Sequence, residues 1–243
     1  MRTAFDDVVL REKLERAVVR LNPSVKEEVR EEAIKTVLRI ASPDTLANNE
    51  AFHRLLTEGV PVSVYQDGME RGERVWLVDF EDPWNNEFTV VNQFTIIENG
   101  HNRRPDVLLF VNGLPLVVIE LKNAADENAT IESAYRQIET YKQQIPSLFT
   151  YNELIIISDG LEACAGSLSA GFSRFTAWKS EDGEHIASPL MSQLKVLING
   201  MLQKDTLLDL VRSFTIFEKQ KTEDLKTGIT TIKTVKKIAA YHQ

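Results

Sequence analysis

Apolar and polar positions along the chain predict both strands and helices, and the clearest pattern is a hairpin. Residues 103–122 read RRPDVLLFVNGLPLVVIELK, in which two apolar runs flank the dipeptide Asn112-Gly113. Asn-Gly between apolar runs is a strong signal for a β-hairpin, because both residues tolerate the positive φ angles of a type I′ turn. The pattern predicts an antiparallel hairpin that begins at Asp106 and returns to Glu120.

The segments around this hairpin predict a mixed α/β order. Helices are expected at Asp7–Arg20, from a capping box at Ser24 and Glu27 to about Ala41, from Pro43-Asp44 to Gly59, at Glu127–Ile145 and across Leu190–Lys219. Strands are expected at Val60–Tyr65, Arg74–Phe80, Phe88–Glu98 and Glu153–Ser158, the last one buried and central. A helix between the Glu120 strand and the Glu153–Ser158 strand makes a β-α-β crossover, which we expect to be right-handed. The predicted fold class is α/β, a mixed β-sheet flanked by helices.

Two carboxylates and one ammonium group gather at the open end of the predicted hairpin. Side chains alternate between the faces of a strand, so Glu120 and Lys122 should share a face that Leu121 does not. Mg²⁺ takes oxygen ligands and keeps several waters, so Asp106, Glu120 and the backbone carbonyl of Leu121 would suffice to hold it. The ion would activate a water and neutralise charge on a phosphate, and Lys122 would orient or deprotonate the water or stabilise the transition state. These residues predict metal-assisted phosphodiester hydrolysis.

Each of these residues also has a purely structural interpretation. An Asp that follows a Pro often only starts a strand or caps a turn, and a Glu-x-Lys pair on an edge strand is usually solvated. The catalytic hypothesis depends on three positions that converge on one hairpin.

The same residues resemble a nuclease signature. Pro105-Asp106 followed by Glu120-Leu121-Lys122 is similar to the PD-(D/E)xK pattern. The flanking sequence is more specific and resembles the N-terminal nuclease region of type I restriction endonuclease R subunits. The segments that carry this resemblance are Asn102–Asp106, Phe110–Leu116, Val118–Asn123, Ser158–Ala163, Phe175–Lys179 and, as a lead-in to a helicase motor, Lys237–Gln243. The resemblance implies a restriction-endonuclease-like core.

The helix expected at Glu127–Ile145 adds a second candidate element. Gln137 and Tyr141 are four residues apart and therefore lie on the same helical face. In the family that the chain resembles, a Gln-x-x-x-Tyr pair on this helix is linked to nuclease activity. The resemblance implies that Gln137 bonds near the metal or the scissile phosphate and that Tyr141 contacts a phosphate or orients Gln137. The alternative is that Tyr141 is an ordinary core aromatic and Gln137 is solvated.

Composition and charge indicate the class of protein and how strongly the chain could bind DNA. Of the 243 residues 43% are hydrophobic and 26% are charged, which is usual for a soluble globular protein, and the single Cys164 supports neither a disulfide framework nor a zinc site. No apolar run has the length of a membrane span and residues 1–20 are too charged for a secretory signal, so we expect a cytoplasmic protein with no membrane partner. The net charge of −8 predicts weak intrinsic DNA binding, since phosphate contacts dominate affinity. Arg103 and Arg104 are the candidate DNA contacts.

The resemblance implies a place in a larger enzyme. Residues 1–185 are expected to form the PD-(D/E)xK endonuclease domain, and residues 186–243 a helical linker that leads towards a helicase motor. The implied activity is that of an Mg²⁺-dependent type I site-specific deoxyribonuclease, with Mn²⁺ able to substitute, that acts on double-stranded DNA and has little or no activity as an isolated fragment. The implied partners are the modification and specificity subunits and the C-terminal helicase domains of the same chain. Because the sequence has no GxxxxGK[ST] motif, ATP is expected only through those domains. The alternatives are a docking module with a degenerate or regulatory site and a stand-alone nuclease of the same fold.

Overall fold

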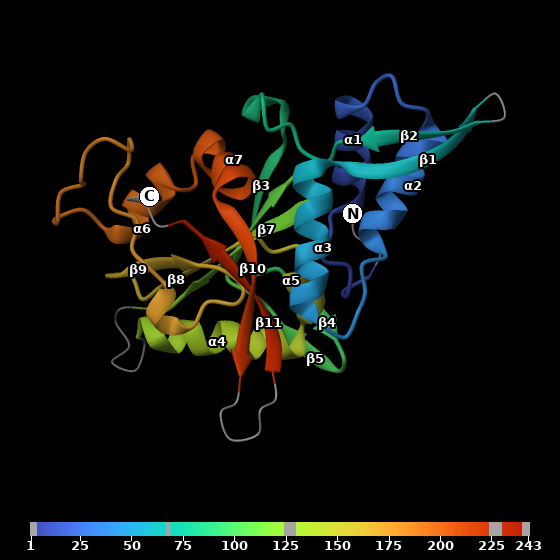
Figure 1. The fold of residues 1–243 in the computed structure, drawn as a ribbon. Coiled ribbons are helices and arrows are strands. Elements are labelled where there is room, and N and C mark those ends of the chain that lie inside the picture. The colour runs from blue at the N-terminus through green and yellow to red at the C-terminus, as the bar shows by residue number, and fades with distance from the viewer. Residues whose placement is uncertain (1–3, 67–68, 124–129, 224–229, 240–243) are drawn as a thin grey trace. The chain divides into compact units, whose positions relative to one another are not determined.

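The computed structural model describes residues 4–66, 69–123, 130–223 and 230–239 (Figure 1). The chain forms two compact units, one of Met1–Glu120 with Arg136–Glu153 and one of Leu121–Tyr135 with Leu154–Gln243. A five-stranded mixed sheet has the strand order β3-β6-β7-β8-β9 and is flanked by helices, which confirms the predicted fold class. The predicted boundary between residues 185 and 186 stays a prediction.

The elements alternate along the chain as an α/β protein requires. The α-helices are α1 (Arg11–Leu21), α2 (Glu27–Leu38), α3 (Thr45–Glu58), α4 (Ile131–Gln144), α5 (Pro146–Thr150), α6 (Gln193–Gly200) and α7 (Lys204–Ser213). The strands are β1 (Val60–Gln66), β2 (Met69–Val75), β3 (Phe88–Asn92), β4 (Ile96–Glu98), β5 (His101–Arg103), β6 (Val107–Val111), β7 (Leu114–Leu121), β8 (Leu154–Ser158), β9 (Ala163–Gly166), β10 (Thr215–Glu223) and β11 (Thr230–Ile238). Among the described helices none is both long and apolar enough to cross a membrane. The predicted helix start at Glu127 and the motif residues 240–243 lie outside the described residues.

The N-terminal helices begin where local capping and turn geometry place them. Helix α3 starts beside Pro43-Asp44, as the sequence predicted, and the Asp44 carboxylate caps it by accepting hydrogen bonds from the backbone N–H groups of Leu46 and Ala47, at 2.9 and 3.1 Å. The capping box predicted at Ser24 is wrong. Residues 23–25 form a turn and α2 begins only after Lys26, so Ser24 lies outside the helix.

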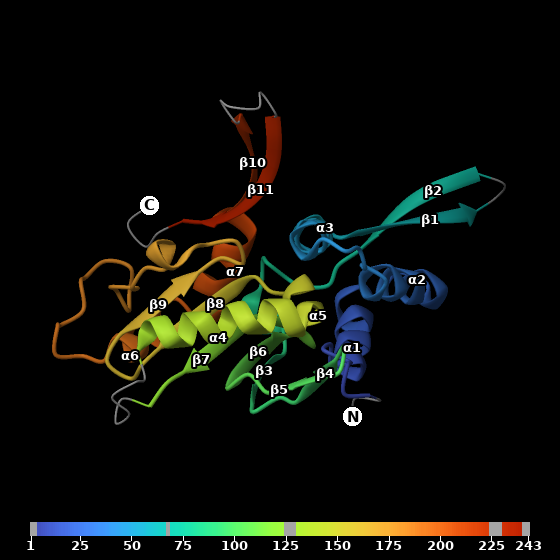
Figure 2. The ribbon, with the colours of Figure 1, turned by 90° about the horizontal axis from the view of Figure 1, so that it is seen from below.

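The hairpin of β1 and β2 lies against α2 (Figure 2), but its second strand comes earlier than predicted. Val60 pairs with Val75, so the strand expected at Arg74–Phe80 is wrong and β2 ends at Val75. The buried Asn22 side chain supplies the physical reason, because it bonds both the N–H and the C=O of Trp76, each at 2.8 Å. These two bonds use the groups that would have continued the ladder.

The long strand expected at Phe88–Glu98 is also wrong, because the chain breaks at Gln93. This residue has a φ of 52°, in the left-handed region that non-glycine residues seldom adopt. The break divides the segment into β3, which pairs with β6, and β4, which pairs with β5.

The hairpin of β6 and β7 confirms the prediction made from Asn112-Gly113. The two residues have φ angles of 51° and 84°, and the strands on either side are antiparallel. Asn112 is fully buried and its amide nitrogen donates to the Leu77 carbonyl at 2.9 Å. Two features disfavour any side chain at position 113. The φ angle of Gly113 is positive, and a Cβ there would lie 2.5 Å from the Leu10 carbonyl oxygen.

The register of this hairpin shifts once. Val107 pairs with Ile119 and Leu109 with Val117, but Phe110 pairs with Pro115, so Leu116 is the extra residue of a β-bulge. Its carbonyl accepts a hydrogen bond of 2.7 Å from the Glu153 backbone N–H.

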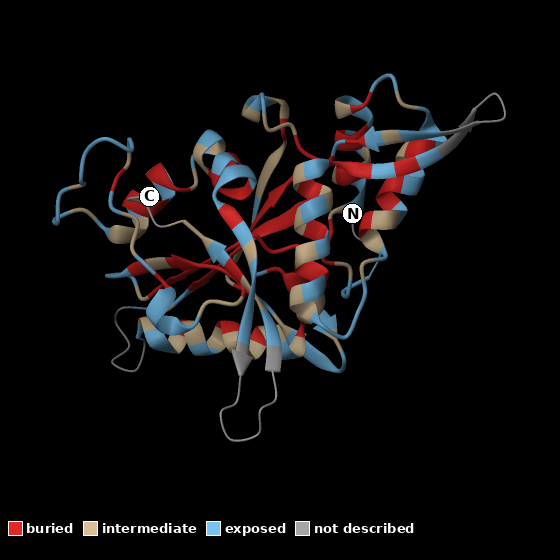
Figure 3. Cartoon of the chain, viewed as in Figure 1, coloured by how far each residue is buried: buried red, intermediate tan, exposed pale blue. Residues whose placement is uncertain are grey.

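Strand β8 is the buried strand that the sequence predicted, since all five of its residues are buried (Figure 3). The backbone N–H of Glu153 bonds to the carbonyl of Leu116, and that of Lys122 to the carbonyl of Ser158 at 2.8 Å. Residue numbers therefore rise in the same direction along β7 and β8, which is the sign of a parallel pair. The right-handed crossover between these strands stays a prediction.

The segment Leu190–Lys219, expected to be helical throughout, contains two helices and the start of a strand. Helix α7 ends at Ser213, and β10 begins at Thr215 and pairs along its length with β11. Residues 215–219 therefore form a strand because they pair with β11, which begins more than ten residues later in the chain. Sequence periodicity over one window contains no information about such a partner.

Candidate active site

Asp106 and Glu120 meet at the open end of the β6–β7 hairpin. Val107 pairs with Ile119, so the same register continued by one residue sets Asp106 opposite Glu120. Asp106 is half-buried and Glu120 is only 3% exposed. Like charges directly opposite each other in an antiparallel pair are destabilising, so this arrangement does not serve stability.

Tyr141 on α4 joins these carboxylates. Its hydroxyl lies close enough to the Glu120 carboxylate for that side chain to influence its pKa. Burial raises the pKa of Tyr141 well above its ordinary value, and the negative charges of Glu120 and Asp106 raise it further, while Arg103 opposes the shift. One helix and both hairpin strands thus bring Asp106, Glu120 and Tyr141 together within the first unit.

The remaining predicted residues of this unit lie around that centre. Gln137 is half-buried one turn before Tyr141, and within the described residues its side chain makes no hydrogen bond. Arg103 ends β5 and donates from its Nε to the Gln144 side chain at the end of α4. Arg104 is exposed. The helical face therefore carries both Gln137 and Tyr141, and Tyr141 is the one whose pKa the two carboxylates raise.

Leu121 and Lys122 belong to the second unit, and their place beside Glu120 follows from the chain itself. Leu121 is the last residue of β7 and is 37% exposed, whereas Lys122 is half-buried. The alternation of buried Glu120, exposed Leu121 and half-buried Lys122 agrees with the predicted facing of the side chains.

Gln93 is a contact that the sequence reasoning missed. Its side-chain Nε2 donates to Asp106 Oδ1 at 2.8 Å, and its backbone N–H donates to the Asp106 carbonyl at 2.8 Å. No motif marked this residue, which lay inside a segment expected to be one continuous strand. The signal that could have found it is structural, namely the positive φ that ends β3.

The donor set at this site fits a hard divalent cation. The Asp106 and Glu120 carboxylates lie opposite each other. Together with the backbone carbonyl of Leu121, which ends β7, they offer the oxygen ligands that Mg²⁺ prefers. Among the described residues there is no group of three or more His, Cys, Asp or Glu that could hold a metal. A magnesium site needs only one or two carboxylates from the protein, because waters complete its shell.

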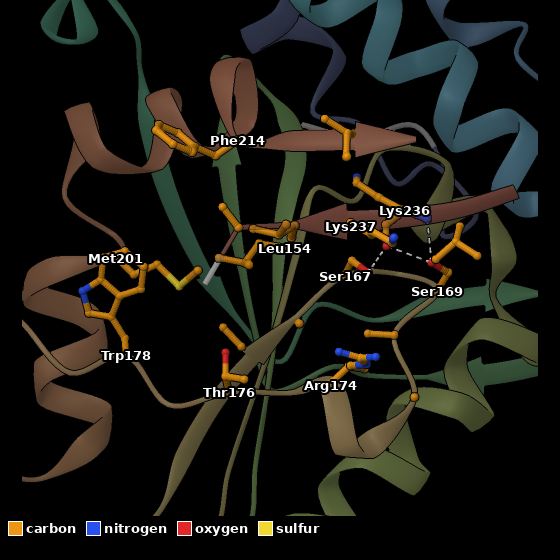
Figure 4. A pocket seen from close by; sticks show the side chains of 18 of the residues that line it. Leu154, Ser167, Ser169, Arg174, Thr176, Trp178, Met201, Phe214, Lys236 and Lys237 are labelled. Atoms are coloured by element: carbon orange, nitrogen blue, oxygen red, sulfur yellow. Dashed lines mark hydrogen bonds between the residues drawn. The ribbon is translucent and has the colours of Figure 1, made fainter. Parts of the chain in front are cut away.

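A cavity of about 860 Å³ lies within the second unit (Figure 4). Its polar lining comprises Ser167, Ser169, Arg174, Thr176, Trp178, Ser213, Gln220, Lys236 and Lys237. The hydroxyls of Ser167 and Ser169 donate to the Lys236 carbonyl at 2.6 and 3.0 Å, and the Lys236 N–H donates to Ser169 at 2.7 Å. None of the predicted site residues is among those that line this cavity.

Comparison with known proteins gives consistent matches. Residues 2–174 match the family model described as type I restriction enzyme R protein N terminus. The chain is 44% identical over 239 residues to the type I restriction enzyme HindI endonuclease subunit of Haemophilus influenzae, covering 97% of this chain and 22% of that protein. It is 32% identical over 168 residues to the EcoprrI endonuclease subunit of Escherichia coli, covering 65% of this chain and 50% of that protein. The chain therefore spans about a fifth of the first relative and half of the second.

Proposed function

Because the chain belongs to the type I restriction enzyme R protein N-terminal family, we propose that its carboxylate site hydrolyses DNA phosphodiester bonds with a divalent metal ion. The observation that supports this most directly is that the register of the hairpin sets Asp106 opposite Glu120, with Tyr141 close enough for both carboxylates to raise its pKa. The related proteins are named endonuclease subunits, which agrees with the proposal.

The metal would be held by the Asp106 and Glu120 carboxylates and the Leu121 carbonyl. Mg²⁺ is the proposed ion, and Mn²⁺ would substitute because it also accepts oxygen ligands. When bound, the ion would lower the pKa of a water and neutralise charge that develops on the phosphate.

The remaining residues would position the reacting groups or donate hydrogen bonds to them. Lys122, two residues after Glu120, would orient or deprotonate the attacking water or place its positive charge beside the phosphate. The Tyr141 hydroxyl keeps its proton at neutral pH, since its pKa is raised, and so remains a donor that fixes the Glu120 carboxylate. Gln137, one turn away, would donate its amide to the scissile phosphate.

DNA would reach this site by delivery rather than by strong intrinsic binding. The net charge of −8 leaves Arg103 and Arg104 as the proposed phosphate contacts close to the carboxylates. We propose that helicase domains further along the same chain move double-stranded DNA with ATP, and that specificity and modification subunits choose its sequence. The cytoplasm is the proposed location.

The test compares the complete R subunit, assembled with its partner subunits, with its Lys122→Ala variant. We expect the variant to lose plasmid cleavage and to keep ATP hydrolysis, because Lys122 belongs to the nuclease site and not to the motor. Lys195→Ala, an exposed lysine on α6, serves as the matched control and should keep both activities. Cleavage at the wild-type rate by Lys122→Ala would contradict the proposal and favour a docking module with a degenerate site.

A further inference from the structure

The backbone at Gln93 has a conformation that its residue type does not favour. Its φ of 52° lies in the left-handed region, where Gly, Asn and Asp are the usual residues. A strand break alone would be met by Gly without strain. Unfavourable backbone conformations of this kind persist where the surrounding structure requires them and are concentrated at functional sites.

The strained backbone brings two donors of Gln93 to one residue. The backbone N–H reaches the Asp106 carbonyl and the side-chain amide reaches Asp106 Oδ1, each at 2.8 Å. The first bond fixes the main chain of Asp106 relative to the end of β3. The second fixes the rotation of its carboxylate, so two bonds from one residue determine where the carboxylate oxygens point.

We propose that Gln93 is a positioning residue that orients the Asp106 carboxylate for the divalent metal, an inference that rests on the proposed function. A carboxylate has about four lone-pair sites on its two oxygens, so an amide bond to Oδ1 leaves acceptor capacity for an ion. Hydrogen bonds to a ligating carboxylate hold it in the orientation that the metal needs, and loss of such a partner typically weakens metal affinity or activity by about 10- to 100-fold.

The side chain and the backbone of Gln93 can be tested separately. Gln93→Gly removes the amide and relieves the positive φ, so the fold and the backbone bond to Asp106 should be retained. Gln93→Met keeps the length of the side chain and removes only its donor. Asn99→Gly is the matched control, because Asn99 has a φ of 50° in the turn between β4 and β5.

The measurement is Mn²⁺ binding to the complete R subunit without DNA or ATP, followed by the electron paramagnetic resonance signal of free Mn²⁺. Wild type, Asp106→Ala, Gln93→Gly, Gln93→Met and Asn99→Gly are compared, each with its thermal unfolding midpoint. We expect both Gln93 variants to bind about 10- to 100-fold more weakly than wild type, with Gln93→Gly at least as stable, and Asn99→Gly to bind like wild type. Plasmid cleavage by the assembled Gln93→Gly enzyme should recover as Mg²⁺ is raised, which a purely structural role would not produce.

The outcomes separate the inference from the function on which it rests. Equal binding by wild type and Asp106→Ala would overturn the proposed metal site and this inference with it. Weaker binding by Asp106→Ala with wild-type affinity in both Gln93 variants would overturn the role of Gln93 alone. A Gln93→Gly variant whose weakened binding comes with a lowered unfolding midpoint, while Gln93→Met binds normally, would assign Gln93 to folding and likewise overturn the proposal.

Discussion

The carboxylate site of the first unit and the cavity of the second use polar groups in opposite ways. In the cavity, Ser167 and Ser169 bond to the backbone of Lys236, and the Lys236 ammonium lies 5.4 Å from the centre of the Phe217 ring. These contacts hold strand β11 and stabilise the fold. At the hairpin, Asp106 and Glu120 lie opposite each other, and two carboxylates so placed repel each other when both are ionised.

The difference illustrates that a large cavity and the proposed site of chemistry can lie in different parts of a protein. The cavity has the volume of a ligand pocket, but its serines already bond the protein itself and Lys237 pairs with Glu218. The hairpin has the less stable arrangement, and charge groups that oppose stability are expected at sites that bind an ion or a substrate. The variants below test that contrast.

The largest effect is expected from the carboxylates themselves. Asp106→Ala or Glu120→Ala should abolish plasmid cleavage by the assembled enzyme, because each removes a proposed metal ligand. Asp106→Asn should also raise the free energy of unfolding in metal-free buffer by about 0.2–1 kcal/mol, since it removes one of two opposed charges. Denaturant unfolding beside the cleavage assay measures both, with Asp209→Ala on the exposed face of α7 as the control. Lower stability of Asp106→Asn would show that the rung is structural.

A smaller effect is expected from Tyr141→Phe. The variant removes the hydroxyl beside Glu120 and keeps the buried ring, so packing should survive. Mn²⁺ affinity and cleavage should fall by about 10- to 100-fold, the usual range for a partner of a ligating carboxylate. Binding titrations and cleavage time courses give the two values. Unchanged values for both would return Tyr141 to the role of an ordinary core aromatic.

The smallest effect on activity is expected in the cavity. The double variant Ser167→Ala with Ser169→Ala removes hydroxyls that bond the Lys236 backbone, so it should lower the free energy of unfolding by about 1–3 kcal/mol. Mn²⁺ affinity should not change, because the cavity is not lined by the carboxylates. Ser173→Ala, at an exposed serine, is the matched control for stability. A loss of Mn²⁺ affinity in the double variant would remove the distinction between the two regions.

The sequence predicts best what local chemistry decides. Asn112-Gly113 specifies its own turn, and the two-residue spacing of Glu120 and Lys122 at the end of β7 predicts that they share a face. The end of β2 could not be read in this way, because it depends on the Asn22 side chain more than fifty residues earlier. The strand that begins at Thr215 likewise depends on a distant partner.

The same distinction applies to the candidate site. Asp106, Glu120 and Tyr141 could be named from spacing and from a family resemblance, whereas Gln93 could not. Its contact with Asp106 depends on the positive φ of Gln93, and no neighbouring residue type predicts that backbone conformation. The roles of Lys122 and Gln137 stay predictions.

The bulge at Leu116 has a consequence for how this hairpin can vary in length. With the bulge, the pairing runs from Leu109 with Val117 to Val107 with Ile119, and the same register sets Asp106 opposite Glu120. If the same residues formed a regular ladder with no bulge, the register of Phe110 and Pro115 would continue unshifted and bring Ile119, an apolar side chain, opposite Asp106. The pleat would then be out of step by one residue, and Glu120 would turn to the other face. Straightening the bulge would therefore keep every proposed site residue in the sequence and still separate the two carboxylates in space, whereas deletion of Leu116 itself would leave Asp106 opposite Glu120.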